Sequence, residues 1–420
     1  MDTGDTAWIL ASSALVLFMT PGLALFYGGM VRAKSVLNMM MMSFLAMAII
    51  PILWVLYGYS IAFDNDLGGG LLGGFDLIGL KGMNMDTAFG TIPAYVFVAF
   101  QLMFAIITVA LISGAIADRA KFGGWAVFVV LWVSVVYFPV AHWVFSFDGD
   151  DGFKGGWIAN RLGALDFAGG TAVHINAGAA GLALALVLGK RVGWKRDPMR
   201  PHNLPFVLLG AGLLWFGWYG FNAGSAVGSN GLAGLAFINT TVATAAAILG
   251  WLLVEVIRDK KATSLGGASG AVAGLVAITP ACGALTPVGS IGLGIIAGIL
   301  CALAVGLKYT FGYDDSLDVV GVHLVGGLVG TLLIGFLASG DVGILYGGNF
   351  DQLGKQAIAA GAVLAYSFIL TYIIGTVIDK TIGFRITEED EVTGIDQVEH
   401  LETAYEFAGS GGGSHLTKGV

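Results

Sequence analysis

Two stretches, DFAGGTAVHINA (166–177) and DVVGVHLVGG (318–327), decide how this chain folds. Each places one histidine, His174 or His323, in an apolar segment with almost no other ionisable group. An ionisable side chain at the centre of a bilayer costs at least ~2.5 kcal/mol on insertion scales, so such a residue is by default a functional candidate. Histidine also gains or loses a proton near neutral pH. The two rings could handle protons, ligate a metal or cofactor such as haem, or simply pack between helices.

Composition identifies the chain as a membrane protein. Of its 420 residues, 56% are hydrophobic and only 11% are charged, whereas soluble domains run near ~25% charged. Its 66 glycines allow helices to approach closely, as packing inside a membrane requires. We therefore predict an all-α polytopic bundle and not an enzyme. The formal net charge of −8 does not identify a partner, and we expect no nucleic acid, no metal and no cofactor.

Apolar runs long enough to span a bilayer occur eleven times. The transmembrane domain is predicted over 1–380, followed by a polar, acidic tail over 381–420 with a flexible, Gly/Ser-rich end at 409–420. The predicted helices are 7–29, 35–62, 92–116, 123–145, 163–188, 204–226, 233–257, 264–283, 290–311, 319–338 and 356–379.

Loop charges predict the orientation, because Lys and Arg mark cytoplasmic loops. Basic residues follow the first, third, fifth and seventh helices, whereas the loops after the second and fourth are acidic, with Asp148, Asp150 and Asp151 in the latter. The N-terminus is predicted to lie outside and the C-terminus in the cytoplasm, across the inner membrane.

An odd number of helices per half gives the two halves, about 1–190 and 201–340, opposite orientations, as in inverted-repeat transporters. The fifth and tenth helices would then be counterparts, with Asp166 and His174 matching Asp318 and His323. His174 would lie about eleven residues into its helix, near the midplane. A carboxylate at a helix N-terminus is stabilised by free N–H groups. We therefore predict a structural capping role for Asp318 and leave Asp166 open between capping and attracting a cation.

Aromatic residues cluster near the predicted outer ends of several helices. AFQLMFA (99–105) contains Phe104, GWYGFNAGSA (217–226) contains Phe221 and Ser225, and AHWVF (141–145) ends in Phe145. Aromatic faces attract cations by ~0.5–2 kcal/mol, and a serine oxygen can accept an N–H. Aromatic residues are also common in packed bundles and at membrane interfaces, so this pattern alone leaves both interpretations open.

Taken together, nearly the whole chain resembles the ammonium transporter (Amt/Mep/Rh) family, in its bacterial Amt branch. The Asp-x₇-His segment in its DFAGG context and the second GVH are the most specific features. The segments that carry the resemblance are LFYGG (25–29), AFQLMFA (99–105), DFAGGTAVHINA (166–177), GKRVG (189–193), PHNLP (201–205), GWYGFNAGSA (217–226), FINTTVATAAAILGW (237–251), GLVAITPACG (274–283) and DVVGVH (318–323).

The resemblance implies a homotrimer in the membrane lipid, with a pore in each protomer that conducts ammonium, ammonia and methylammonium. It implies that Phe104, Phe145, Ser225 and Asp166 form the outer recruitment site and that Phe104 and Phe221 form the pore gate. His174 and His323 would be the twin histidines of the pore, sharing a hydrogen bond. It also implies a PII-type signalling protein as a cytoplasmic partner.

One position departs from the family pattern. Bacterial members typically carry Trp where this chain has Phe145, and Phe is the weaker cation–π partner. Recruitment should then depend more on Ser225 and Phe104, unless Trp143 takes the place of the missing ring or the acidic loop after Phe145 compensates. Two functions of other classes stay open: an ammonium sensor that signals through the tail, and a haem protein ligated by the two histidines.

Overall fold

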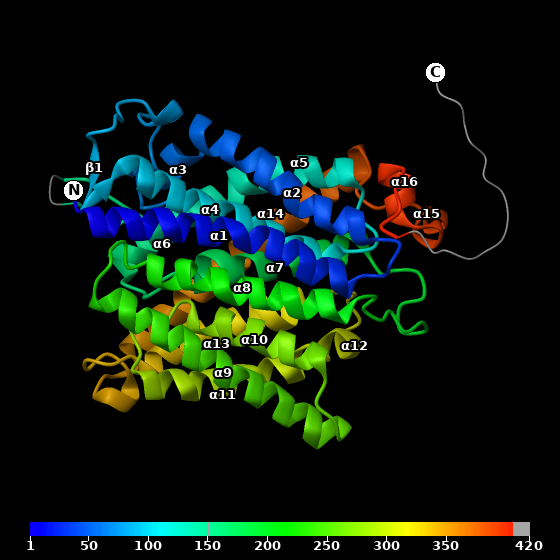
Figure 1. Ribbon diagram of the computed structural model, residues 1–420. Coiled ribbons are helices and arrows are strands. Elements are labelled where there is room, and N and C mark those ends of the chain that lie inside the picture. Colours follow the sequence, from blue (N-terminus) through cyan, green and yellow to red (C-terminus); the bar gives the residue numbers. More distant parts are fainter. Residues whose placement is uncertain (150–151, 406–420) are drawn as a thin grey trace.

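The computed structural model of the chain describes residues 1–149 and 152–405, which form a bundle of long helices (Figure 1). The predictions for Asp150, Asp151 and the end at 409–420 lie outside the described residues. The N-terminus lies at one end of the bundle and the C-terminal tail packs at the other (Figure 1). We call these the N-terminal end and the tail end.

The first half of the chain contributes five membrane-length helices, three of which are lengthened by a π-helical turn. Short elements in the connections are η2 (Ile78–Leu80), a hairpin of β1 (Ala88–Phe89) and β2 (Ile92–Pro93), and η5 (Ile158–Leu162). The helices are α1 (Thr3–Met30), α2–η1–α3 (Val36–Leu53, Trp54–Gly58, Tyr59–Phe63), α4–η3 (Ala94–Ile112, Ser113–Ile116), α5–η4–α6 (Phe122–Trp132, Val133–Tyr137, Phe138–Phe145) and η6–α7 (Gly170–Ile175, Asn176–Leu188).

The second half also contributes five apolar helices, four of them of membrane length, and adds one further helix and a folded tail. The five are α8 (Leu204–Gly224), α9 (Gly231–Asp259), the shorter α10 (Ser264–Ile278), α11–α12 (Pro287–Ala304, Leu307–Phe311) and η7–α13 (Val320–Leu324, Val325–Leu337). They are followed by η8 (Ile344–Tyr346), the long α14 (Phe350–Thr381), and α15 (Glu388–Thr393) and α16 (Ile395–His400) in the tail.

These elements confirm the predicted all-α membrane fold. In the described part of the chain, 10 helices are long and apolar enough to cross a membrane, and the 15-residue α10 is the eleventh apolar helix. The fifth predicted helix begins late, at Gly170 instead of 163, because Gly169 has a φ of 122° and the preceding residues form a loop. His174 is therefore in the second turn of its helix, not about eleven residues in.

The two halves meet along their first helices and along the histidine-bearing turns. α1 packs along α8 as the most extensive helix pair of the bundle, and η6 contacts η7. Gly22, Gly29 and Gly210 allow the first contact, since a Cβ on Gly210 would come within 2.4 Å of the Phe26 backbone. α14 lies outside both halves, against α7, α13 and α5.

The tail folds back onto the bundle as far as the structure describes it. α16 packs on α2, and the side chain of Asp396 accepts the N–H groups of Leu37 and Asn38 at 3.0 and 2.8 Å. The free N–H groups of a helix start need such acceptors. The tail therefore completes the first turn of a helix that begins near the other end of the chain.

Candidate functional site

A cavity of about 380 Å³ opens at the N-terminal end, where loops and helix ends from both halves meet. We call it the vestibule. Its wall is mostly apolar and contains six phenylalanines, and its polar groups include Gln101, Asp166 and Ser225. The predicted residues Phe104, Phe145, Asp166 and Ser225 all line it. Sequence reasoning missed four further aromatic residues in the wall: Phe89, Phe97, Phe147 and Phe167.

Ser225 is oriented to accept an N–H from a ligand in the vestibule. Its hydroxyl donates to the carbonyl of Phe221 at 2.8 Å, so the lone pairs of its oxygen stay available. The ring of Phe145 lies 6.4 Å from that of Phe104, nearly edge-on at 67°. A cation in the vestibule could therefore meet both aromatic faces and one oxygen acceptor.

Phe104 and Phe221 close the floor of the vestibule. Both side chains are buried, with 1% and 0% of their surface exposed, and their ring centroids are 4.4 Å apart at an interplanar angle of 46°. Phe104 comes from α4 in the first half and Phe221 from α8 in the second. The predicted gate pair is thus in contact across the interface of the two halves.

His174 and His323 lie below this pair, edge to edge. Their Nδ1 atoms are 3.3 Å apart, and the ring planes differ by 21°. One neutral ring can donate this hydrogen bond and the other accept it. A haem iron held in line between the two nitrogens, as its opposed axial ligands, would need bonds of about 2 Å on each side, hence about 4 Å between them. The spacing of 3.3 Å therefore disfavours haem iron with these two atoms as its axial ligands.

The space beside the histidines is narrow and otherwise apolar. It amounts to about 10 Å³. Trp218 stacks on His174 with ring centroids 5.4 Å apart, and its indole N–H donates to Thr279, so it offers the pore an aromatic face. The Nε2 atom of His174 has no hydrogen-bond partner among the described residues. The lining residues are Met19, Leu23, Ile107, Leu111, His174, Leu214, Trp218, Phe221, Val272 and His323.

Asp166 caps the helix that carries His174. Its carboxylate accepts the N–H groups of Gly169, Gly170 and Thr171 at 2.8, 2.6 and 2.8 Å, and also the Thr171 hydroxyl. Both oxygens are therefore engaged by the start of η6. Of the two roles left open by the sequence, the geometry favours capping, and any effect on a cation in the vestibule would act through the charge and not by direct ligation.

The predicted capping role of Asp318 is wrong, because Asp315 fills it. Asp315 accepts the N–H groups of Val319 and Val320 at 3.1 and 2.8 Å, whereas Asp318 pairs with the Nζ of Lys308 at 2.7 Å. Asp318 has a φ of 63°, which places it in the turn before the helix. Asp315 precedes His323 by eight residues, as Asp166 precedes His174. Asp315, and not Asp318, is the counterpart of Asp166.

Trp143 does not replace the ring that Phe145 lacks. It is buried away from the vestibule, where its indole N–H donates to Leu71 and its ring contacts Trp157 and Tyr366. Within the acidic loop, Asp148 is exposed and accepts the backbone N–H of Gly155 at 2.8 Å. From this segment, Phe145 and Phe147, and not Trp143, line the vestibule with an aromatic ring.

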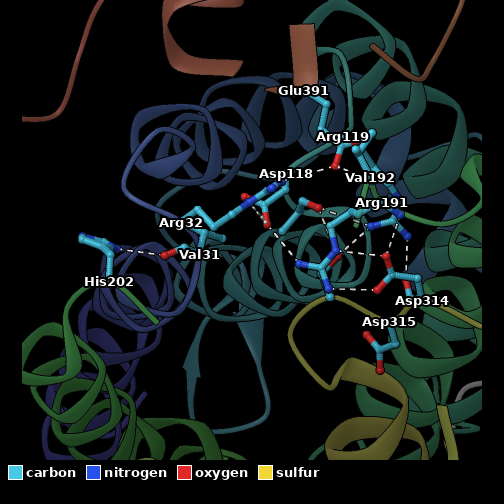
Figure 2. A network of polar contacts seen from close by, with 12 residues as sticks. Val31, Arg32, Asp118, Arg119, Arg191, Val192, His202, Asp314, Asp315 and Glu391 are labelled. Carbon is cyan, nitrogen blue, oxygen red and sulfur yellow. Dashed lines mark hydrogen bonds and ion pairs between the residues drawn. The ribbon is translucent and has the colours of Figure 1, made fainter. Parts of the chain in front are cut away.

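A buried ionic network joins the helix ends at the tail end (Figure 2). Arg191 contacts Asp314 at 2.9 Å and Asp118 at 3.0 Å, and Glu391 of the tail accepts from Arg32 at 3.3 Å and from the N–H of Val192 at 2.9 Å. Burial alone would raise the pKa of Asp118, but the charges of Arg191 and Arg32 hold it below its usual value. Asp314 directly precedes Asp315, so the network reaches the helix of His323.

Two halves of five helices each, with a cavity and a narrow, mostly apolar space between them, define a polytopic membrane protein. The pattern of the Ammonium Transporter Family matches residues 7–405. The chain belongs to that family, and its membership supports ammonium transport.

Similar proteins come from several kingdoms. An "Ammonium transporter" of Mycobacterium tuberculosis is 61% identical, over 98% of this chain and 92% of that protein. One from Bacillus subtilis is 49% identical, over 97% and 99%. Among solved structures, a "Sensor Amt Protein" superimposes with a TM-score of 0.87 at 29% identity, covering 94% of this chain and 98% of the other. Mep2 of Saccharomyces cerevisiae does so with 0.82 at 33%, covering 92% and 91%.

Proposed function

We propose that the protein recruits ammonium in the vestibule, where the ion gives up a proton to water, and that ammonia then passes beside His174 and His323 to the cytoplasm. The observation that carries this proposal is the order in which a cavity, a closed ring pair and a narrow passage follow one another along one path. An aromatic cavity with an oxygen acceptor is followed by a closed pair of phenyl rings and then by a narrow apolar passage with two hydrogen-bonding rings.

The physics of the passage supports transport of the neutral molecule. Moving an unpaired ion into an apolar interior costs tens of kcal/mol by Born solvation, whereas a small neutral amine loses only a few hydrogen bonds. Potassium cannot give up a proton, so the same passage rejects it without a size filter. In the vestibule, Phe104, Phe145 and the Ser225 oxygen would bind ammonium or methylammonium, and the charge of Asp166 would favour a cation nearby.

The placement in the membrane is part of the same proposal. The basic loops predict that the tail end faces the cytoplasm, and Lys34, Lys121 and Lys190 all belong to that end. The family resemblance suggests a homotrimer in the inner membrane and a PII-type protein that docks at the tail end. The exposed apolar side chains along α9, such as Leu249, Leu253 and Ile257, offer a surface for lipid or a second protomer.

An ammonium sensor is the second candidate, favoured by the structural likeness to a protein titled "Sensor Amt Protein". Glu391 of the tail contacts the helix ends at Arg32 and Val192, and these contacts would transmit such a signal from the pore to the tail. Transport stays the first candidate, because the relatives with the higher identities are named ammonium transporters.

The central test is flux through the full-length protein in liposomes or on a solid-supported membrane, with ammonium, methylammonium and potassium as substrates. We expect ammonium and methylammonium to pass and potassium to be rejected. His174→Ala should lower the ammonium flux at least tenfold or abolish rejection of potassium, because the passage loses its hydrogen-bonding ring. His202→Ala is the matched control, since His202 lies at the tail end and contacts Val31 and Tyr405. Wild-type flux and selectivity in His174→Ala would rule out a role for the ring.

Exchanging Phe145 for tryptophan tests the recruitment site. A larger π face binds a cation about 0.5–1 kcal/mol more strongly, so the apparent KM for ammonium should fall roughly two- to fivefold. The ring has room, because Phe145 borders the 380 Å³ vestibule. Trp143→Phe should leave KM unchanged, since Trp143 faces away from the cavity. Equal KM values for Phe145→Trp and wild type would count against recruitment at this ring.

A further inference from the structure

A second polar cavity, of about 340 Å³, lies at the tail end between the loop 191–199 and the short helix α12. We call it the α12 pocket. It is remote from the vestibule and from the passage between the histidines, with which it shares no lining residue. Four of its lining residues carry a positive charge and one carries a negative charge: Arg191, Lys195, Arg196, Lys308 and Asp197.

Only part of this positive charge is neutralised within the chain. Arg191 is paired with Asp118 and Asp314, and Lys308 is paired with Asp318. Lys195 and Arg196 are both exposed and form no ion pair with any residue of the described chain. Among the described residues, the pocket therefore has two cationic side chains without an ion pair, against one lining carboxylate, that of Asp197.

The geometry of these groups is held by an aromatic pair. The rings of Trp194 and Tyr309 stack at 6.1 Å with an interplanar angle of 16°. The Nζ of Lys195 lies 4.7 Å from the Trp194 ring and donates to the carbonyl of Tyr309 at 2.6 Å, and the Nζ of Lys190 lies 5.0 Å from the same ring. Cation–π contacts and one hydrogen bond thus hold the ammonium groups of Lys190 and Lys195 at the Trp194 ring beside the pocket, and neither group forms an ion pair with a described residue.

The position of α12 indicates what the pocket faces. α12 continues the membrane-spanning α11, and it exposes 40% of Leu307, 53% of Tyr309 and 73% of Phe311. Tyrosine and tryptophan next to exposed aliphatic and phenyl groups are typical of the boundary between lipid tails and water. On the proposed orientation, this boundary belongs to the cytoplasmic leaflet, where anionic lipids concentrate and basic pockets between helices bind their head groups.

We propose that the α12 pocket binds an anionic phospholipid of the cytoplasmic leaflet. Its phosphate lies between Lys195 and Arg196, and its acyl chains lie along the exposed side chains of α12. Guanidinium is suited to phosphate because its N–H groups match two phosphate oxygens. This inference depends on the proposed orientation but not on the route that ammonium takes through the pore.

The test is native mass spectrometry of the full-length, detergent-solubilised protein titrated with phosphatidylglycerol or with phosphatidylcholine of the same acyl chains. We expect phosphatidylglycerol to bind more tightly. Lys195→Ala combined with Arg196→Ala should weaken it at least tenfold, at roughly fivefold per charge removed. The matched control is Lys260→Ala combined with Lys261→Ala, which removes two positive charges from another loop at the tail end and should leave the affinity unchanged.

Two further arms keep the proposal decisive. Asp197→Asn removes the acidic lining residue and should tighten binding of phosphatidylglycerol, and this variant retains every basic side chain. Soluble glycerol phosphate should bind far more weakly than the lipid. Equal binding of the two would assign the pocket to a soluble phosphate ester and overturn the lipid assignment, as would unchanged affinity in the Lys195/Arg196 double variant. Ammonium flux of each variant, measured in phosphatidylcholine liposomes, shows whether the variant still folds and transports. This measurement is separate from the measurement of lipid binding.

Discussion

Replacing Arg191 with leucine lowers the free energy of unfolding by about 3–5 kcal/mol, because two buried carboxylates lose their closest cationic partner. Arg191 is 6% exposed in its side chain, and the side chains of Asp118 and Asp314 are 1% and 0% exposed. Desolvation alone would be unfavourable for both carboxylates, and Arg32 beside Asp118 and Arg119 near Asp314 replace only part of the charge of this guanidinium. We expect the loss as a drop in the midpoint of thermal unfolding in detergent.

The matched control is Arg258→Leu, which breaks an ion pair with Asp259 whose two side chains are each 50% exposed. Exposed pairs are worth about 0–1 kcal/mol, so the midpoint should hardly move. The pH dependence gives a second readout. Burial would raise the pKa of Asp314, but hydrogen bonding and charge from Arg191 lower it, as for Asp118. Carboxylates with lowered pKa stabilise above their ordinary pKa and lose that contribution as pH falls.

The difference in stability between wild type and Arg191→Leu should therefore be largest near pH 7 and should narrow as the solution is acidified through pH 4 and below, where the carboxylates become protonated. A difference that stays constant across this range would show that packing, and not charge, carries the effect of Arg191.

Replacing Asp166 with alanine is expected to abolish most ammonium flux. The four backbone N–H groups of residues 169–172, at the start of η6, would lose the carboxylate that accepts them. The hydroxyl of Thr171 would lose its acceptor as well. A buried donor left unsatisfied costs about 1–3 kcal/mol, and loss of a helix cap about 0.5–2 kcal/mol. Because His174 lies in the second turn of this helix, its alignment with His323 would be lost as well.

Asp148→Ala separates this effect from the loss of negative charge. Asp148 is a carboxylate at the same end of the bundle, but it is exposed and caps no helix. Liposome flux in Asp148→Ala should stay within about twofold of wild type, whereas Asp166→Ala should lose at least tenfold. Similar losses in both variants would mean that surface charge matters more than the cap.

The transmembrane architecture could be predicted from the sequence, because apolar length alone marks a helix in a membrane. The ends of helices were predicted less well, since they depend on local caps. The fifth helix begins at Gly170 because Asp166 engages the N–H groups there, and apolar runs do not show such a bond. The folding of the tail was also missed, because Glu391 and Asp396 are buried by partners more than 350 residues away, Arg32 and Leu37 among them.

For the candidate site, the predicted contacts within the phenylalanine pair and within the histidine pair are present in the structure. Phe104 contacts Phe221, and His174 contacts His323. Asp318 was the wrong residue, because it precedes His323 by five residues, whereas the eight-residue spacing of Asp166 and His174 points to Asp315. Gln101 and Phe167 in the vestibule could not be foreseen, since Gln101 lies on α4 and Phe167 in the loop before η6, and only the folded structure brings them to one cavity.

The capping of α2 by Asp396 has a consequence for biosynthesis. Residues 36–38 leave the ribosome early, but the side chain that accepts the N–H groups of Leu37 and Asn38 is made about 360 residues later, after the last membrane helix. Until then, water or other groups must accept hydrogen bonds from these two N–H groups at the start of α2. A chain whose translation ends before residue 396 would carry every membrane helix, but it would lack the carboxylate that accepts the N–H groups of Leu37 and Asn38.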